Sequence, residues 1–319
     1  MKGRSTLQEN FIVAVSAVLP IFFLMFIGVI VKRMGFLNHE ELNHMNRMVF
    51  RVFFFCLMFY SIYTMNIEEH LNIGLAVFCF FGLLGTLILA TILVSFFVKD
   101  NKKRGAMIQA IFRSNYVIMG VPLVQNIYGD GAISVPAMLV VIVVPFFNVF
   151  SVIVLETYRG GKIEILKILS RVLQNPMILG GLFGALFMIL SVKIPEPILK
   201  PIRQVALATT PIALIILGAS FQLNSFHAHI KELTATVLSR LFIVPAVVLA
   251  VAVYMGYRNV ELLTLLSIFA TPTAIASFAM AQQMGSDADL AGNAVVYTSL
   301  FACFTVFLWV FAFKTFNFI

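Results

Sequence analysis

The sequence predicts an all-α integral membrane protein with ten transmembrane helices. Of its 319 residues, 61% are hydrophobic and only 11% are charged, whereas a soluble domain has about 25% charged residues to cover its surface. The mean hydropathy is +1.00. Ten apolar stretches follow one another along the chain, close to the length of about 20 residues that a helix needs to cross the hydrocarbon core. A helix satisfies its own backbone hydrogen bonds there, so these stretches are predicted to be helices.

Seven of the stretches contain no charged residue. The first of them follows Lys2 and Arg4, as the core of a signal peptide would, but it is longer than such a core and is expected to be retained. In chain order the seven are Phe11–Val31, Asn72–Val98, Ala132–Leu155, Pro176–Val192, Val205–Leu223, Leu262–Met284 and Leu290–Phe313.

Three further stretches contain one arginine each. A charged side chain in hydrocarbon is costly, so each arginine is a functional candidate by default. Arg113 is the strongest, while Arg51 and Arg240 lie nearer the ends of their spans, where a long side chain is expected to snorkel to the surface. The three spans are Met48–Met65 with Arg51, Gly105–Ile127 with Arg113, and Leu233–Met255 with Arg240.

The distribution of lysine and arginine predicts the orientation. Twelve of these residues fall in loops on one side of the predicted spans and seven on the other. Loops rich in Lys and Arg face the cytoplasm. The chain is therefore expected to be a multi-pass protein of the cell (plasma) membrane with both termini outside. The same bias accounts for the net charge of +8 without a nucleic-acid partner.

The two halves of the chain align without a gap when one is displaced by 156 residues. Pro20 then falls on Pro176, and Gly28 falls on Gly184. The overall identity is no more than two apolar sequences show by chance, so the prediction rests on the coincidence of helix starts and breaks. Because each half holds five spans, an odd number, the second half is expected to be an inverted repeat of the first.

These features predict one membrane domain in three parts. Residues 1–157 form the first five-helix repeat, residues 158–175 a short cytoplasmic linker, and residues 176–319 the second, inverted repeat. The bilayer is the surrounding partner. A homodimer is compatible with the sequence, although no helix face identifies its contact.

Two spans at equivalent places in the repeats are interrupted. Proline removes a helical hydrogen bond and glycine lets the backbone bend, and freed backbone groups are tolerated at membrane depth only beside protein or a watery cavity. One proline can merely kink a helix, but the pairing predicts two unwound segments that cross near the midplane. Their half-helix N-termini would suit an anion. The fourth span contains Arg113-Ser114-Asn115-Tyr116 and then Gly120-Val121-Pro122, and the ninth contains Thr271-Pro272-Thr273.

The interruptions supply the predicted substrate-binding residues. Arg113 is expected to bring positive charge to the path of a carboxylate, as a bidentate partner. The alternatives are that it snorkels toward the cytoplasmic loop or pairs with a helix C-terminus. The full set is Arg113, Ser114, Asn115, Gly120, Pro122, Thr271, Pro272 and Thr273.

No cofactor is expected. The three cysteines share no metal-ligand spacing, and the uncharged spans offer no carboxylate proton relay. A sodium ion could bind carbonyls freed at the crossing together with Asn115, Thr271 or Thr273. Coupling to H⁺, coupling to Na⁺ and uniport therefore all stay open.

Three segments together resemble one family of transporters. Phe112-Arg113-Ser114-Asn115 with Gly120-Val121-Pro122-Leu123 resembles its fourth span, Asn175-Pro176 the start of its sixth, and Ala206–Phe221 its seventh. The chain is thereby identified as similar to the auxin efflux carrier family, in its short bacterial form, over nearly its whole length. The resemblance implies a scaffold domain and a transport domain with crossed fourth and ninth helices, a fold similar to that of the bile-acid sodium symporters.

The resemblance implies a secondary transporter of small organic anions. Bacterial members are associated with dicarboxylates such as malate and malonate, and plant members export auxin. A sodium-coupled carrier like the bile-acid symporters is the alternative, followed by a channel or sensor. An enzyme would need nucleophiles, carboxylates or metal ligands converging at membrane depth, and the spans show none.

Overall fold

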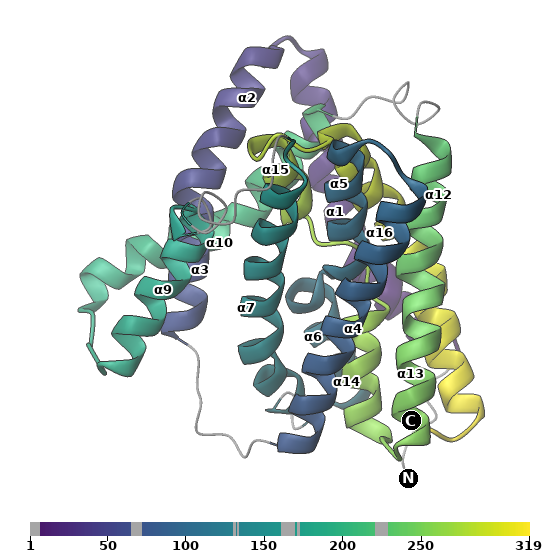
Figure 1. Cartoon of the computed structure of the whole chain (residues 1–319). Coiled ribbons are helices and arrows are strands. Elements are labelled where there is room, and N and C mark those ends of the chain that lie inside the picture. The colour runs from purple at the N-terminus through teal and green to yellow at the C-terminus, as the bar shows by residue number, and fades with distance from the viewer. Residues whose placement is uncertain are drawn as a thin grey trace.

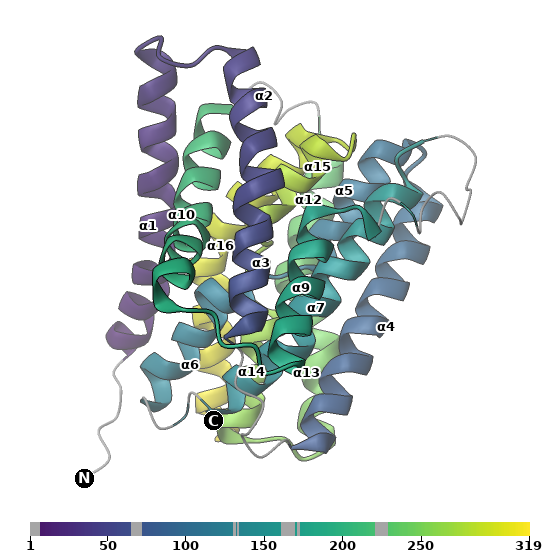
Figure 2. The same ribbon diagram turned by 90° about the vertical axis from the view of Figure 1, so that its left-hand side faces the viewer.

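The protein is all-helical among the residues that the structure, a computed structural model, describes: 7–64, 72–129, 132, 134–160, 170, 173–220 and 229–319. The helices lie mostly along one common direction (Figure 1, Figure 2). Six helical runs in this part of the chain are long and apolar enough to cross a membrane, and shorter apolar helices accompany them. The six are Glu40–Tyr63, Ile73–Phe97, Ser134–Thr157, Glu196–Ser220, Ile230–Tyr254 and Ala288–Thr315.

The described elements follow the predicted spans in order. In the first half they are α1 (Leu7–Arg33), α2 (His39–Met48), η1 (Val49–Phe53), α3 (Phe54–Tyr63), α4 (Ile73–Phe97), α5 (Asn101–Phe112), η2 (Tyr116–Gly120), α6 (Val121–Tyr128) and α7 (Ser134–Thr157). In the second half they are α9 (Pro176–Ile189), α10 (Glu196–Ser220), α12 (Ile230–Leu238), η4 (Ser239–Ile243), α13 (Val244–Tyr254), α14 (Asn259–Phe269), α15 (Ala276–Gln283) and α16 (Ala288–Thr315). The η elements are single π-helical turns.

Polar side chains fix where several helices begin. An Asn or Asp oxygen just before the helix accepts a hydrogen bond from a backbone N–H of the first turn, which has no partner inside the helix. This occurs at Asn72 before α4, Asp100 before α5, Asn175 before α9 and Asp287 before α16. The expected helix start at Asn175-Pro176 is thus confirmed, with proline in the first turn.

Two helices begin well before the spans that hydropathy predicted. The second span was expected from Met48, but the helical run starts at His39, where Asn38 and Glu41 form a capping box. The seventh was expected from Val205, but α10 starts at Glu196. Hydropathy marks contact with hydrocarbon, whereas a helix can continue beyond it with polar turns. The expected span ends at 65 and at 221–223 lie outside the described residues.

The fourth and ninth spans are interrupted, as the sequence predicted. In the fourth, α5 ends at Phe112 and the helix resumes at Tyr116. In the ninth, α14 ends at Phe269 and α15 begins at Ala276. Each span is therefore two half-helices joined by a short non-helical segment.

The helices form two groups, each with its own apolar core. The four-helix group consists of α1, the α2–α3 run, α9 and α10, with closest contacts between α1 and α10 and between α3 and α9. The crossover bundle consists of α4 to α7 and α12 to α16. Buried residues of α7, α15 and α16 also join the core of the four-helix group, so these helices form the contact between the groups.

Glycines let the helices of the four-helix group approach closely. A Cβ at Gly28 of α1 would overlap the carbonyl oxygen of Ile215 in α10, and a Cβ at Gly218 of α10 would overlap that of Met25 in α1. Gly180 and Gly184 of α9 have the same relation to α3. This is the small-residue packing that brings membrane helices together without a hydrophobic driving force.

Gly218→Ala is expected to lower the unfolding temperature in detergent. The added methyl group meets backbone atoms, which cannot rotate away, so α1 and α10 must separate at a cost of about 1–3 kcal/mol. Gly85→Ala in α4 is the matched control, because no heavy atom lies within 4 Å of its added Cβ and alanine is the better helix former. Equal unfolding temperatures for the two variants would contradict the packing argument.

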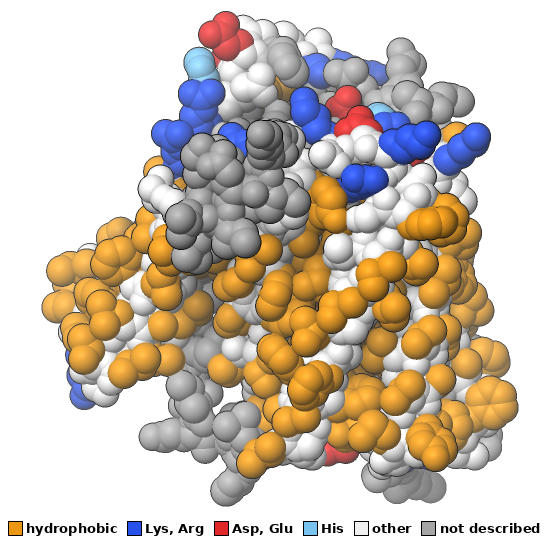
Figure 3. All heavy atoms as spheres, in the orientation of Figure 1, with side chains coloured by type: hydrophobic (Ala, Val, Ile, Leu, Met, Phe, Trp, Pro, Cys, Tyr) orange, Lys and Arg blue, Asp and Glu red, His pale blue; other side chains and the backbone are white. Residues whose placement is uncertain are grey.

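On the face that Figure 3 shows, charged side chains lie toward the ends of the molecule. Lys and Arg side chains gather at the upper end in Figure 3, above a broad apolar belt. This end holds Lys99, between α4 and α5, and Arg104 in the first turns of α5. The start of α1 and the C-terminus both lie toward the opposite end (Figure 2).

Candidate functional site

The two helix breaks pair with each other inside the crossover bundle. Ser114 and Thr273 form an isolated antiparallel β-bridge. The backbone N–H of Asn115 donates to the carbonyl of Pro272 at 2.8 Å, and that of Ala274 donates to the carbonyl of Arg113 at 3.2 Å. Residues about 160 positions apart in the chain thus meet where both helices unwind, and each break satisfies backbone groups that the other frees.

Arg240 joins the ends of both interrupted helices. Its side chain is fully buried. Its Nη1 donates to the carbonyls of Ile111 (3.0 Å) and Phe112 (3.4 Å) at the end of α5, while Nε donates to Thr271 and Nη2 to Ile268, both at 2.8 Å, at the end of α14. The last carbonyls of a helix have no partner inside it and form the negative end of its dipole, so one guanidinium satisfies and neutralises two helix ends.

The expectation that Arg240 snorkels was therefore wrong. Its place in the span is near one end, but π turn η4 and the crossing of the half-helices bring the side chain into the centre of the bundle. Arg51, in π turn η1 of the second span, is exposed as expected. Both the η2 and the η4 turns precede a proline, Pro122 and Pro245, and this was the one local signal that set Arg240 apart from Arg51.

Arg113 is buried beside the break, and its partners among the described residues are neutral. The side chain is 5% exposed, which excludes snorkelling. Its Nη1 contacts the sulfur of Met280 at 2.7 Å, and its Nη2 donates to Oδ1 of Asn148 at 2.9 Å. No ion pair within the described ranges includes it. Isolated charge in a protein interior is strongly unfavourable, so this guanidinium has unmet capacity for an anion.

Three further polar atoms around the break are buried and have no hydrogen-bond partner among the residues that the structure describes. They are Nδ2 of Asn115, Oγ of Ser114 and Oγ of Ser277 in the first turn of α15. Buried polar groups are almost always satisfied in proteins. Two of these residues belong to the predicted site, and Ser277 is an addition that only its place at the start of α15 reveals.

The two predicted threonines are held by hydrogen bonds within the protein. The hydroxyl of Thr271 donates to the carbonyl of Ser267 at 2.7 Å, and that of Thr273 donates to the carbonyl of Ala110 at 2.9 Å. The backbone N–H of Thr273 donates to Oγ1 of Thr298 in α16. These contacts orient the ninth-span break against α5, α14 and α16.

Gly120 and Pro122 lie in the helix that follows the fourth-span break. A Cβ at Gly120 would contact the carbonyl oxygen of Ser267 at 2.8 Å, so glycine permits close packing on α14. Pro122 stands in the first turn of α6, directly after π turn η2. Of the eight predicted residues, the structure therefore brings Arg113, Ser114, Asn115, Thr271, Pro272 and Thr273 together at the breaks, and it places these two one to two turns away.

The described part of the chain contains no group of three or more His, Cys, Asp or Glu side chains that could hold a metal ion. The sequence suggested sodium ligands among carbonyls freed at the crossing together with side-chain oxygens of Asn115, Thr271 or Thr273. In the structure the carbonyls of Arg113, Thr271 and Pro272 each accept a hydrogen bond from a protein donor. Two buried guanidinium groups also lie at the crossing. This environment favours an anion over a cation.

Polar contacts extend from the site to the four-helix group. Asn148 of α7 accepts from Arg113 and contacts the sulfur of Met58 in α3 through Nδ2. Nearer the basic end, Nε2 of Gln282 in α15 donates to Oδ1 of Asn43 in α2 at 2.8 Å, and Asn46 of α2 donates to Oε1 of Gln282. The candidate site thus lies close to the contact between the two groups.

Comparisons with known proteins agree with this architecture. A family model described as membrane transport protein matches residues 13–310. An uncharacterized transporter of Methanocaldococcus jannaschii is 23% identical over 310 residues, covering 93% of this chain and 98% of that protein. The matched residues cover nearly the whole chain, and the family is one of transporters, not of enzymes. The chain belongs to the membrane transport protein family, that of the auxin efflux carriers.

Proposed function

We propose that this protein is a secondary transporter that binds a small carboxylate at the paired breaks and moves it by alternating access. The observation that supports this most directly is the burial of Arg113 with neutral partners only. A carboxylate would give the Arg113 guanidinium a negatively charged partner through charge-assisted, bidentate hydrogen bonds. Nδ2 of Asn115 and the hydroxyls of Ser114 and Ser277 would donate to its remaining lone pairs.

The half-helices add to this preference for an anion. The first N–H groups of a helix have no partner inside it and form the positive end of its dipole. Both η2 and α15 start at the crossing. The opposite, negative ends of α5 and α14 are neutralised by Arg240, which leaves positive potential to act on a ligand.

An inverted-repeat plan with ten spans fits the helix bounds. The α4 helix and the run Ile230–Tyr254 have 25 residues each and are displaced by 157 positions at both ends. The close glycine contacts repeat as well, because α1 packs on α10 as its counterpart α9 packs on α3. Repeats of this kind place the substrate near the membrane midplane, where broken helices meet.

The transport movement we infer is a displacement of the crossover bundle relative to the four-helix group. Among the described residues few polar contacts join the two groups, so few hydrogen bonds need to break in such a movement. The Gln282 contacts with Asn43 and Asn46 lie on the basic side, which the positive-inside rule assigns to the cytoplasm. Access from that side would require these bonds to break. With this orientation both termini lie outside the cell.

Uptake of radiolabelled malate into proteoliposomes tests the proposal. Asn115→Ala is expected to reduce the initial rate about tenfold or more, since a lost hydrogen bond to a charged group costs about 1.5–3 kcal/mol. Pro272→Ala is expected to reduce the rate as well, because alanine restores a backbone N–H and favours a continuous helix where the ninth span must be interrupted. Pro201→Ala is the control, because this proline lies in α10 and is exposed. Unchanged uptake in both site variants would refute the site.

The same assay separates the competing modes of transport. A carrier saturates with malate concentration, whereas flux that grows linearly would indicate a channel. Replacing sodium by potassium on both sides should leave the rate unchanged if no sodium ion is coupled, as the occupied carbonyls at the crossing suggest. A strict sodium requirement would favour the symporter alternative.

A further inference from the structure

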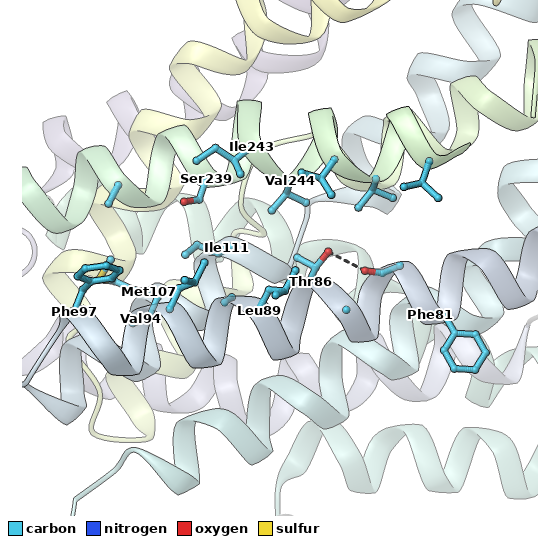
Figure 4. Close-up of a pocket in the computed structure, with 18 of the residues that line it drawn as sticks. Phe81, Thr86, Leu89, Val94, Phe97, Met107, Ile111, Ser239, Ile243 and Val244 are labelled. Atoms are coloured by element: carbon cyan, nitrogen blue, oxygen red, sulfur yellow. Dashed lines mark hydrogen bonds between the residues drawn. The ribbon is translucent and has the colours of Figure 1, made fainter. Parts of the chain in front are cut away.

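A long apolar groove runs down the lipid-facing side of the crossover bundle, away from the breaks. Its walls are α4 and the α12–η4–α13 run, and its floor includes Met107 and Ile111 of α5 (Figure 4). Its volume is about 1240 Å³. This exceeds the usual 300–1,000 Å³ of a small-molecule pocket.

Small residues on α4 create this space. At Gly85 an added Cβ would meet no heavy atom within 4 Å, so the helix leaves the groove unfilled there. Gly82 and Ala90 also line it. The larger lining side chains, such as Phe81, Leu89 and Ile243, are apolar and exposed. At the depth of the bilayer such a groove is filled by hydrocarbon, because water would find almost no hydrogen-bond partner there.

Charged residues line only one end of the groove. Lys99 and Asp100 belong to the loop after α4, Lys103 to α5, and Lys231 and Glu232 to α12. Lys103 and Glu232 form an ion pair at 2.7 Å across the floor, and Asp100 caps α5. Lys99 and Lys231 are exposed and have no ion-pair partner in the part of the chain described.

We propose that this groove binds an anionic glycerophospholipid of the cytoplasmic leaflet. One acyl chain would lie along Gly85 and the apolar walls, and the phosphate would lie between Lys99 and Lys231. Basic pockets between membrane helices on the cytoplasmic side are the kind of site that selects anionic headgroups. The assignment goes beyond the transport site, since no residue of the breaks lines the groove, and it does not depend on which substrate is carried.

The site has a structural consequence for the crossover bundle. The groove separates α4 from α13, which contact each other only weakly. A lipid that fills it would hold the two helices at their observed separation while Arg240, on the same α12–α13 run, keeps its contacts with the breaks. The lipid is thus expected to stabilise the bundle.

Native mass spectrometry of the full-length protein tests the proposal. The probes are phosphatidylglycerol and phosphatidylcholine with identical acyl chains, added in equal amounts to delipidated protein. Wild type is expected to retain one phosphatidylglycerol in preference to phosphatidylcholine. Each lysine near an anionic headgroup should contribute about fivefold to this preference, so the double variant Lys99→Ala/Lys231→Ala should lose about 25-fold. Gly85→Leu should abolish binding of both lipids by filling the groove.

Matched controls lie elsewhere on the surface. Lys193→Ala/Lys200→Ala removes two exposed lysines outside the groove, and Leu182→Phe adds bulk to an exposed face of α9. Neither should alter lipid retention. Equal retention of the two lipids by wild type, or an unchanged preference in the double lysine variant, would overturn the proposal. A dimer mass that Gly85→Leu removes would also overturn it, by assigning the groove to a second copy. Lys99 and Lys231 are exposed, so their replacement should not prevent folding. The double lysine variant therefore still tests the proposal if Gly85→Leu does not fold.

Discussion

Replacing Arg240 by methionine is expected to destabilise the protein by about 3–5 kcal/mol, the range seen when one partner of a buried charged interaction is removed. Methionine matches much of the side-chain volume but donates no hydrogen bond. The carbonyls of Ile111, Ile268 and Thr271 would then be left unsatisfied in the membrane interior. Folded proteins are stable by only about 5–15 kcal/mol. The yield of monodisperse variant in detergent should therefore be much lower than that of wild type, and the variant should unfold at a markedly lower temperature.

Arg51→Met is the matched control, because Arg51 also lies in a π turn of a predicted span but is exposed. Its unfolding temperature should stay near that of wild type. Arg240→Lys should fall between the two, since one ammonium cannot reach both helix ends in the way that the guanidinium fork does. If Arg240→Met and Arg51→Met unfold at the same temperature, Arg240 does not hold the crossing together.

Replacing Arg113 by methionine is expected to have the opposite signature, with folding retained and ligand binding lost. A buried cation with neutral partners contributes little to stability, so its replacement by an apolar side chain should leave the unfolding temperature unchanged or raise it. Binding of a dicarboxylate should weaken by at least about 30-fold, because truncating one partner of a buried charged pair costs about 2–5 kcal/mol.

Thermal stabilisation of purified protein by a panel of small acids measures this effect, since a ligand of the folded state raises apparent stability by mass action. The panel is run with and without sodium and at two pH values. Met280→Leu is the control, because it removes the sulfur contact of Arg113 but leaves the charge. A malate-induced shift that survives in Arg113→Met would remove Arg113 from the site. Absence of any shift in folded wild type would direct the search to hydrophobic monocarboxylates or to substrates that are not acids.

Much of the fold was readable from the sequence because the bilayer imposes simple rules. Apolar length marked the spans, and prolines next to polar residues marked the interruptions near Asn115 and Pro272, which the structure places in contact. Asn175-Pro176 marked a helix start through local capping. Each of these signals depends on a few neighbouring residues and on the cost of unsatisfied backbone groups in hydrocarbon, so no knowledge of the tertiary arrangement was needed.

The sequence alone thus determined the class of the protein, its family and the place of its two helix breaks. Only the tertiary structure decided the roles of the arginines. Arg51 and Arg240 each lie toward one end of a predicted span, yet one is exposed and the other joins two helix ends. Arg113 depends on Asn148 and Met280, which lie far along the chain. Whether a charged side chain in a membrane span is exposed or buried depends on the helix ends and side chains that surround it in three dimensions. Hydropathy along one span does not describe those neighbours.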